Sequence, residues 1–161
     1  MIPKQDLLKI IKKETATTVK VMRAFPESQE QFKPHERSSD ALQLIRTFVL
    51  EMYLVKGYGL GQAIDPSIFK TYLPKTVGEI IADFEKETNE IFTAIEALSD
   101  DQFAKKVEFG GTTFTVDSFI LMMFHDQIHH RGQLTVYVRM AGGKVPSIYG
   151  PSADDSSTNL G

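Results

Sequence analysis

Hydrophobic residues recur at helical spacing in four long stretches of this chain, separated by segments in which the pattern breaks. The expected helices span residues 2–24, 38–57, 76–98 and 116–140. Ser38 or Ser39 is placed to cap the second helix, and Thr76 with Glu79 matches the capping box of the third. Amphipathic helices of this length bury their apolar faces against one another, so the pattern predicts an all-α four-helix bundle.

The connecting segments have turn-forming compositions. Residues 25–37 and 57–74 are rich in proline, glycine and polar residues, with a short turn expected at 67–72. Apolar residues alternate from Lys105 to Val116 around Gly110 and Gly111, which predicts a small β-hairpin before the last helix. We expect one domain over residues 1–161, with a polar tail from about residue 153. The apolar residues of 145–152 are expected to fold back over the bundle, over its pocket or against a second subunit.

Composition excludes several classes of protein. The 161 residues include no cysteine, so disulfides, iron–sulfur clusters and thiolate ligands are ruled out, and any metal must be held by His, Asp, Glu or hydroxyl groups. A net charge of −3 lacks the basic footprint of a nucleic-acid-binding protein, and we expect no direct nucleic-acid binding. No apolar run reaches the length needed to span a membrane, and the first six residues include charges where a secretory signal is apolar. We therefore expect a cytoplasmic protein with no membrane partner.

Three of the four histidines lie within six residues of the last expected helix, which makes this segment the candidate chemical site. Residues one turn apart point in similar directions, whereas adjacent residues diverge by about 100°. Two ligand pairs are therefore open: His125 with His129, or Asp126 with His130.

A helical projection places Asp126, His130, Gln133 and Tyr137 on one stripe with apolar residues at both ends, which is typical of a pocket lining. The adjoining stripe of His125, His129 and Gly132 could equally be a helix-packing seam. Paired histidines in a bundle can also be hydrogen-bonded core groups without chemistry. For Arg131 and Arg139 the simpler interpretation is solvated or tail-pairing charges.

The run from His125 to Arg139, His-Asp-Gln-Ile-His-His-Arg-Gly-Gln-Leu-Thr-Val-Tyr-Val-Arg, and the segment Lys144 to Ser152 resemble the last helix and tail of the DinB-like family. The resemblance implies an up-up-down-down four-helix bundle, commonly a homodimer, with a divalent metal held by three histidines. Characterised members include thiol-cofactor-dependent S-transferases and isomerases. Many others, including DNA-damage-inducible ones, have no assigned reaction.

Alignment on the Arg-Gly-Gln motif puts Asp126 and His130 at two family ligand positions and Thr47, in the second helix, at the third. Two of the three positions thus depart from histidine. Glu51, one turn beyond Thr47, could add a second carboxylate to a site for Zn, Ni, Mn or Fe.

Two functions follow from these residues and from the resemblance. The first is a metal-dependent enzyme of thiol-cofactor S-transferase or hydrolase type, with His130 as general base and with Tyr137 and Gln133 orienting a small-molecule substrate. The second is a non-catalytic, stress-associated protein that has lost the metal and serves as a small-ligand-binding or structural dimer.

Overall fold

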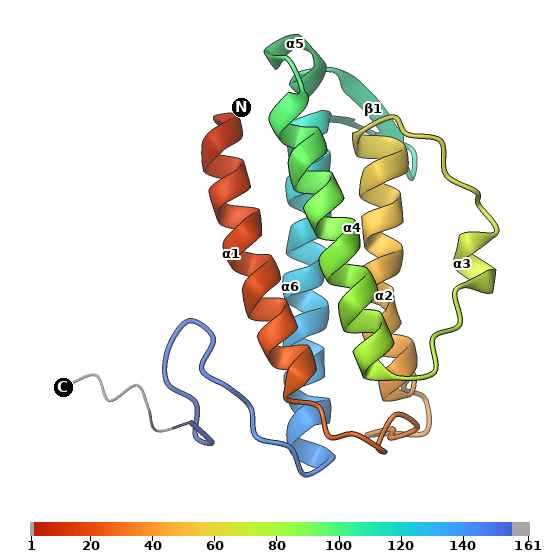
Figure 1. Ribbon diagram of the computed structural model, residues 1–161, viewed down its shortest axis with the longest axis vertical. Helices are drawn as coiled ribbons and strands as arrows, with labels where there is room; N and C mark the ends of the chain where they lie inside the picture. Colours follow the sequence, from red (N-terminus) through yellow and green to blue (C-terminus); the bar gives the residue numbers. More distant parts are fainter. Residues whose placement is uncertain (1, 156–161) are drawn as a thin grey trace.

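The computed structural model describes residues 2–155, and its main feature is a set of four long helices lying side by side (Figure 1). They are α1 (Lys4–Arg23), α2 (Ala41–Leu54), α4 (Val77–Ala97) and α6 (Val116–Met140). Each of α1 and α2 packs against both α4 and α6. The predicted all-α four-helix bundle is therefore confirmed.

The helix directions differ from the expected up-up-down-down order. In Figure 1, α1 runs down, α2 and α4 run up, and α6 runs down. The contacts agree: a Cβ atom added at Gly143, just beyond the end of α6, would lie 2.6 Å from the carbonyl oxygen of Ala24 at the end of α1, so these two helices end together and run parallel. The difference lies in the course of the connections and not in their length, since residues 24–40 and 60–76 are equally long. The segment between α1 and α2 turns at one end of the bundle, whereas only the segment from Leu60 to Thr76 travels its full length.

The N-terminus of α2 is capped by Asp40, not by the expected Ser38 or Ser39. The Asp40 carboxylate accepts from the Gln43 backbone N–H at 2.8 Å, and the Gln43 side chain accepts from the Asp40 N–H at 3.4 Å. Such a reciprocal pair needs Glu or Gln three residues after the cap, and the two serines lack one at that spacing.

Beyond Leu54, α2 does not stop at Gly57 as predicted but widens into a π-helical turn, η1 (Val55–Gly59). Gly59 passes close to α6, where a Cβ atom would lie 3.3 Å from the Ile120 side chain. The short turn expected at 67–72 is present as α3 (Ile68–Thr71).

The Thr76 hydroxyl caps α4 by accepting from the Glu79 N–H, but the Glu79 carboxylate accepts from Lys75 instead of completing the predicted box. A short helix that the pattern did not reveal, α5 (Asp100–Phe103), follows α4. The predicted hairpin is confirmed as strands β1 (Lys106–Phe109) and β2 (Thr112–Thr115), which pair antiparallel beside the start of α6.

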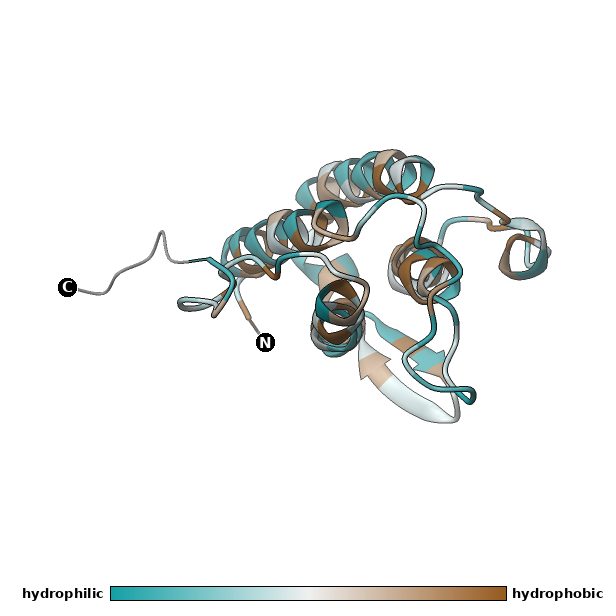
Figure 2. Cartoon of the chain, turned by 90° about the horizontal axis from the view of Figure 1, so that it is seen from below, coloured by the Kyte–Doolittle hydropathy of each residue, from teal (hydrophilic) through white to brown (hydrophobic). Residues whose placement is uncertain are grey.

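The core lies between the four helices, whose apolar residues turn inward in Figure 2. Ile10 belongs to the apolar residues at helical spacing in residues 2–24 that were expected to face the core, but 44% of its surface is exposed. Within residues 2–155, no helix combines the length and the apolar character needed to cross a membrane.

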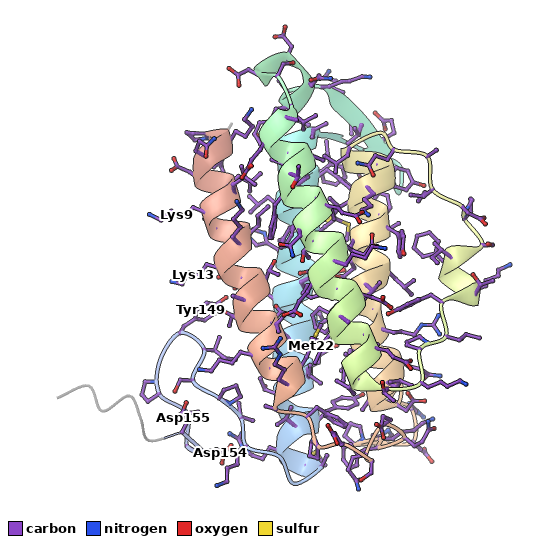
Figure 3. All side chains as sticks on the ribbon, viewed as in Figure 1. Lys9, Lys13, Met22, Tyr149, Asp154 and Asp155 are labelled. Atoms are coloured by element: carbon purple, nitrogen blue, oxygen red, sulfur yellow. The ribbon has the colours of Figure 1, made fainter. Side chains whose placement is uncertain are left out.

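The C-terminal segment folds back as expected, with Val145 buried against the bundle. Figure 3 shows Tyr149 of this segment beside α1. The polar tail predicted from residue 153 lies mostly outside the described residues.

Candidate metal centre on the last helix

The helical period separates the histidines of α6 into two groups. His125 and His129 are exposed, whereas Asp126 and His130 are partly buried and turned toward α2. Of the two pairs that the sequence left open, the structure therefore brings Asp126 and His130 together with the neighbouring helix. The adjoining stripe, with Gly132, faces outward, and a Cβ added at Gly132 would meet no atom within 4 Å.

Glu51 of α2 completes a cluster with this pair. The Nε2 atom of His130 lies 3.3 Å from Oε1 of Glu51 and 3.8 Å from Oδ2 of Asp126. One potential ligand atom from each of the three side chains lies within 4.8 Å of the other two. An imidazole and two carboxylates thus share one small volume between α2 and α6.

Glu51 is the unusual member of this cluster. It is only 3% exposed, and neither of its carboxylate oxygens has a hydrogen-bond partner. Burial, and secondly the nearby charge of Asp126, raise the pKa of Glu51 to about 9. A buried carboxyl group without donors is costly unless it is protonated or meets a cation, so this position favours a positively charged partner.

Thr47, which the family resemblance aligns with a third ligand position, lines the same pocket as His130. Its hydroxyl donates to the Gln43 carbonyl of its own helix at 3.2 Å, and this pocket lies next to the cluster. In this chain the carboxylate of Glu51, one turn further along α2, lies where it can converge with Asp126 and His130.

The pocket has a volume of about 450 Å³, within the usual range for small-molecule sites. It meets the cluster at His130. Its lining residues come from the segment before α2, from α2 and from α6: Ser38, Ser39, Leu44, Thr47, His130, Gln133, Val136 and Tyr137. None of these lining residues is Lys, Arg, Asp or Glu, so the pocket suits an uncharged, partly apolar molecule.

Tyr137 and Gln133, which were expected to orient a substrate, both line this pocket and both also contact protein groups. The Tyr137 hydroxyl donates to the Ser39 carbonyl at 3.0 Å and so holds the segment before α2 against α6. Gln133 contacts the histidines of its own helix.

The donor set fits a divalent cation. Two carboxylates and one imidazole are ligands accepted by Mn²⁺, Fe²⁺ and Zn²⁺, and the lone pairs of Glu51 are otherwise unused. Compared with three histidines, this set adds up to two negative charges and so favours harder cations.

Arg131 was missed as a buried residue, since the sequence suggested a solvated or tail-pairing charge. It is only 1% exposed and donates to the Glu14 carboxylate at 2.7 Å, to the Glu14 carbonyl at 3.1 Å and to Tyr149. Arg131 therefore does contact the tail, through Tyr149, but it is not solvated. Arg139 is exposed and pairs with Asp154 of the tail, in agreement with the prediction.

Residues 10–134 match the family model of the DinB superfamily. The chain is also 33% identical over 86 residues to the Uncharacterized protein YrdA of Bacillus subtilis strain 168. That alignment covers 52% of each protein, so the chain spans about half the length of this curated relative.

Two solved structures share the fold. A DinB-like protein of Bacillus cereus ATCC 10987 superposes with a TM-score of 0.76 at 21% identity, covering 90% of this chain and 97% of that one. The DinB-like protein YjoA of Bacillus subtilis gives a TM-score of 0.68 at 18% identity, covering 94% of this chain and 99% of that one. Since the family model covers more than half of the chain, the protein belongs to the DinB superfamily.

Proposed function

We propose that this protein is a divalent-metal-dependent enzyme acting on a small, uncharged molecule, of hydrolase or S-transferase type. The observation that carries the proposal is the Glu51 carboxyl group, which is buried without a hydrogen-bond partner and lies within 4.8 Å of potential ligand atoms of Asp126 and His130. These three residues would hold the cation. A divalent cation held there would polarise a substrate atom or lower the pKa of a bound water.

The rest of the site would bind and position the substrate. The pocket adjoins the cluster only through His130, so a molecule seated in it would present its reacting end to that side of the cluster. Leu44, Val136 and the ring of Tyr137 offer apolar contacts, and the hydroxyl groups of Ser38 and Thr47 offer hydrogen bonds. His130 is the group nearest to both places and the one able to move a proton between them.

The non-catalytic alternative is favoured by one specific observation. With a pKa near 9, Glu51 without a cation holds a proton at neutral pH, and the protonated cluster needs no metal. In that state the pocket would serve ligand binding alone.

A homodimer and a cytoplasmic location remain predictions from the sequence and the family resemblance. Light scattering of the purified protein tests the first.

The deciding experiment measures metal binding by untagged protein with elemental analysis and calorimetry against Mn²⁺, Fe²⁺, Zn²⁺ and Ni²⁺. Glu51→Gln, Asp126→Asn and His130→Ala should each lower affinity by at least about 100-fold, because each removes one ligand. Two variants serve as controls: His125→Ala, on the exposed face of α6, and Thr47→Val, in the pocket. Both should bind within about 3-fold of the original chain, a change below about 1 kcal/mol.

Two results would overturn the metal centre: no binding by the original chain below millimolar concentration, or an equal loss in His125→Ala. Stoichiometric binding that Thr47→Val abolishes would move the site toward the family's third ligand position.

A further inference from the structure

His130 is held from the side opposite to the carboxylates by a chain of polar contacts along α6. Its Nδ1 atom lies 3.0 Å from Oε1 of Gln133. The Nε2 atom of the same Gln133 amide lies 3.0 Å from Nε2 of His129. Gln133 therefore bridges two adjacent imidazoles, whose ring centroids are 5.3 Å apart.

This contact determines which ring nitrogen of His130 carries the proton. An amide oxygen only accepts hydrogen bonds, so Nδ1 must be the donor to Gln133. A neutral imidazole with its proton on Nδ1 has its lone pair on Nε2. That is the atom facing Glu51 at 3.3 Å and Asp126 at 3.8 Å, where a cation would be bound.

His129 completes the bridge in the matching sense. The Gln133 NH₂ group, which can only donate, lies 3.0 Å from Nε2 of His129, so His129 accepts through that nitrogen while the amide oxygen faces His130. The edge-on contact between His130 and Phe48, with centroids 6.3 Å apart, restricts the imidazole from the α2 side. The ring is thus held by an apolar neighbour on one side and by the bridge on the other.

We propose that Gln133 is a positioning residue that holds His130 in the Nδ1–H tautomer, with His129 as its anchor, and so keeps Nε2 available as a ligand atom before any cation arrives. The benefit to metal binding rests on the proposed function. The tautomer itself is a property of the metal-free protein, which allows the two ideas to fail separately.

The first test is the tautomer of His130 in the metal-free, full-length protein, read from long-range ¹⁵N–¹H correlations of the imidazoles above about pH 8, where histidines are neutral. The original chain should show the Nδ1–H form. Gln133→Met removes the acceptor and should shift His130 toward the Nε2–H form. Gln133→Glu keeps an acceptor oxygen and should restore the Nδ1–H form.

Two further variants complete the design. His129→Ala leaves the amide unanchored and should give a mixture of tautomers, whereas His125→Ala, exposed on the same helix, should leave His130 unchanged. An Nε2–H form in the original chain, or an unchanged tautomer in Gln133→Met, would overturn the proposal. If only His129→Ala left the tautomer of His130 unchanged, the role of Gln133 would stand but His129 would not be its anchor.

The second test is the affinity for Zn²⁺ alone. Residues that hydrogen-bond a ligating histidine typically contribute 10- to 100-fold, so Gln133→Met should bind Zn²⁺ about 10-fold or more weakly and Gln133→Glu close to normally. Equal affinity in Gln133→Met would contradict the positioning role. Absence of Zn²⁺ binding in the original chain would refute the metal centre, while the tautomer experiment would still decide the role of Gln133.

Discussion

Two clusters of ionisable side chains lie on different sides of the same part of α6, and they differ in whether a cation is present to pair with the carboxyl groups. Toward α1, the Arg131 guanidinium meets the carboxylate and carbonyl of Glu14, the Thr18 hydroxyl and the Tyr149 hydroxyl. Toward α2, Glu51 meets Asp126 and His130 but accepts no hydrogen bond. Adjacent residues of a helix point about 100° apart, which sends His130 and Arg131 to different neighbours.

The comparison separates a structural cluster from a candidate chemical one. A buried cation with a carboxylate and three further acceptors needs nothing more, so the Arg131 cluster is complete within the chain. The Glu51 cluster has acceptors but lacks the positive charge to match them. Burial of charge alone therefore does not identify a site; the unbalanced cluster is the one prepared for a cation.

The largest expected effect comes from breaking the balanced cluster. Arg131→Met leaves Glu14 without its charged partner and should lower the free energy of unfolding by about 3–5 kcal/mol, measured by urea denaturation. Arg139→Met is the matched control: it loses the pair with Asp154, but its side chain is 55% exposed, so its loss should stay below about 1 kcal/mol. Equal losses in the two variants would show that the buried Arg131–Glu14 pair contributes no more to stability than an exposed ion pair.

In the Glu51 cluster, by contrast, removing the ionisable group should raise the free energy of unfolding instead of lowering it. The pKa of Glu51 is about 9 in the folded chain against an ordinary 4.5, so between these values only the folded state keeps the proton. The unfolding free energy of the metal-free protein should then fall as pH rises, by at most about 1.4 kcal/mol per pH unit. Glu51→Gln cannot lose a proton, so it should already be more stable than the original chain at about pH 6, by on the order of 2 kcal/mol, and the difference should grow toward pH 9.

Denaturation curves at several pH values between about 5 and 9 check this difference. A saturating divalent cation should remove it, because the cation replaces the proton as the partner of Glu51. Equal pH dependence in the two proteins would mean that Glu51 is ionised without cost, and the contrast between the clusters would disappear.

Hydrophobic periodicity was sufficient to predict most of the fold. The boundaries of α6 agree with the expected 116–140, because both of its ends are marked by turn residues. The π-helical turn after Leu54 could not be predicted, since it depends on how Gly59 approaches α6. The helix order also depended on which connection crosses the bundle, and this is a tertiary property.

The candidate site was predictable only where it depended on the helical period. That period placed Asp126 and His130 on one side of α6, and the one-turn step from Thr47 indicated Glu51. The burial of Arg131 was not visible, because exposed arginine is the usual expectation and its partner Glu14 lies 117 residues away in the chain. Partners distant in sequence become apparent only when the helices are packed.

The smallest of these effects concerns how the tail completes the balanced cluster. Burial alone would raise the pKa of Glu14, but hydrogen bonds from Tyr149 and Arg131 outweigh it and lower the pKa below its ordinary 4.5. Glu14 therefore stabilises the fold above pH 4.5, and this contribution is lost as pH falls through the lower folded value. Tyr149→Phe removes one of the bonds, so it should cost about 1 kcal/mol at neutral pH and raise the pKa of Glu14.

An NMR titration of the Glu14 carboxyl carbon, together with denaturation at neutral and acidic pH, measures both consequences. Tyr58→Phe is the control, because Tyr58 packs through its ring on Phe109 with centroids 5.1 Å apart, a contact that phenylalanine retains. An unshifted Glu14 pKa in Tyr149→Phe would mean that Arg131 alone balances the carboxylate. The tail would then cover the cluster without belonging to it, and the balanced side of α6 would be complete within the bundle.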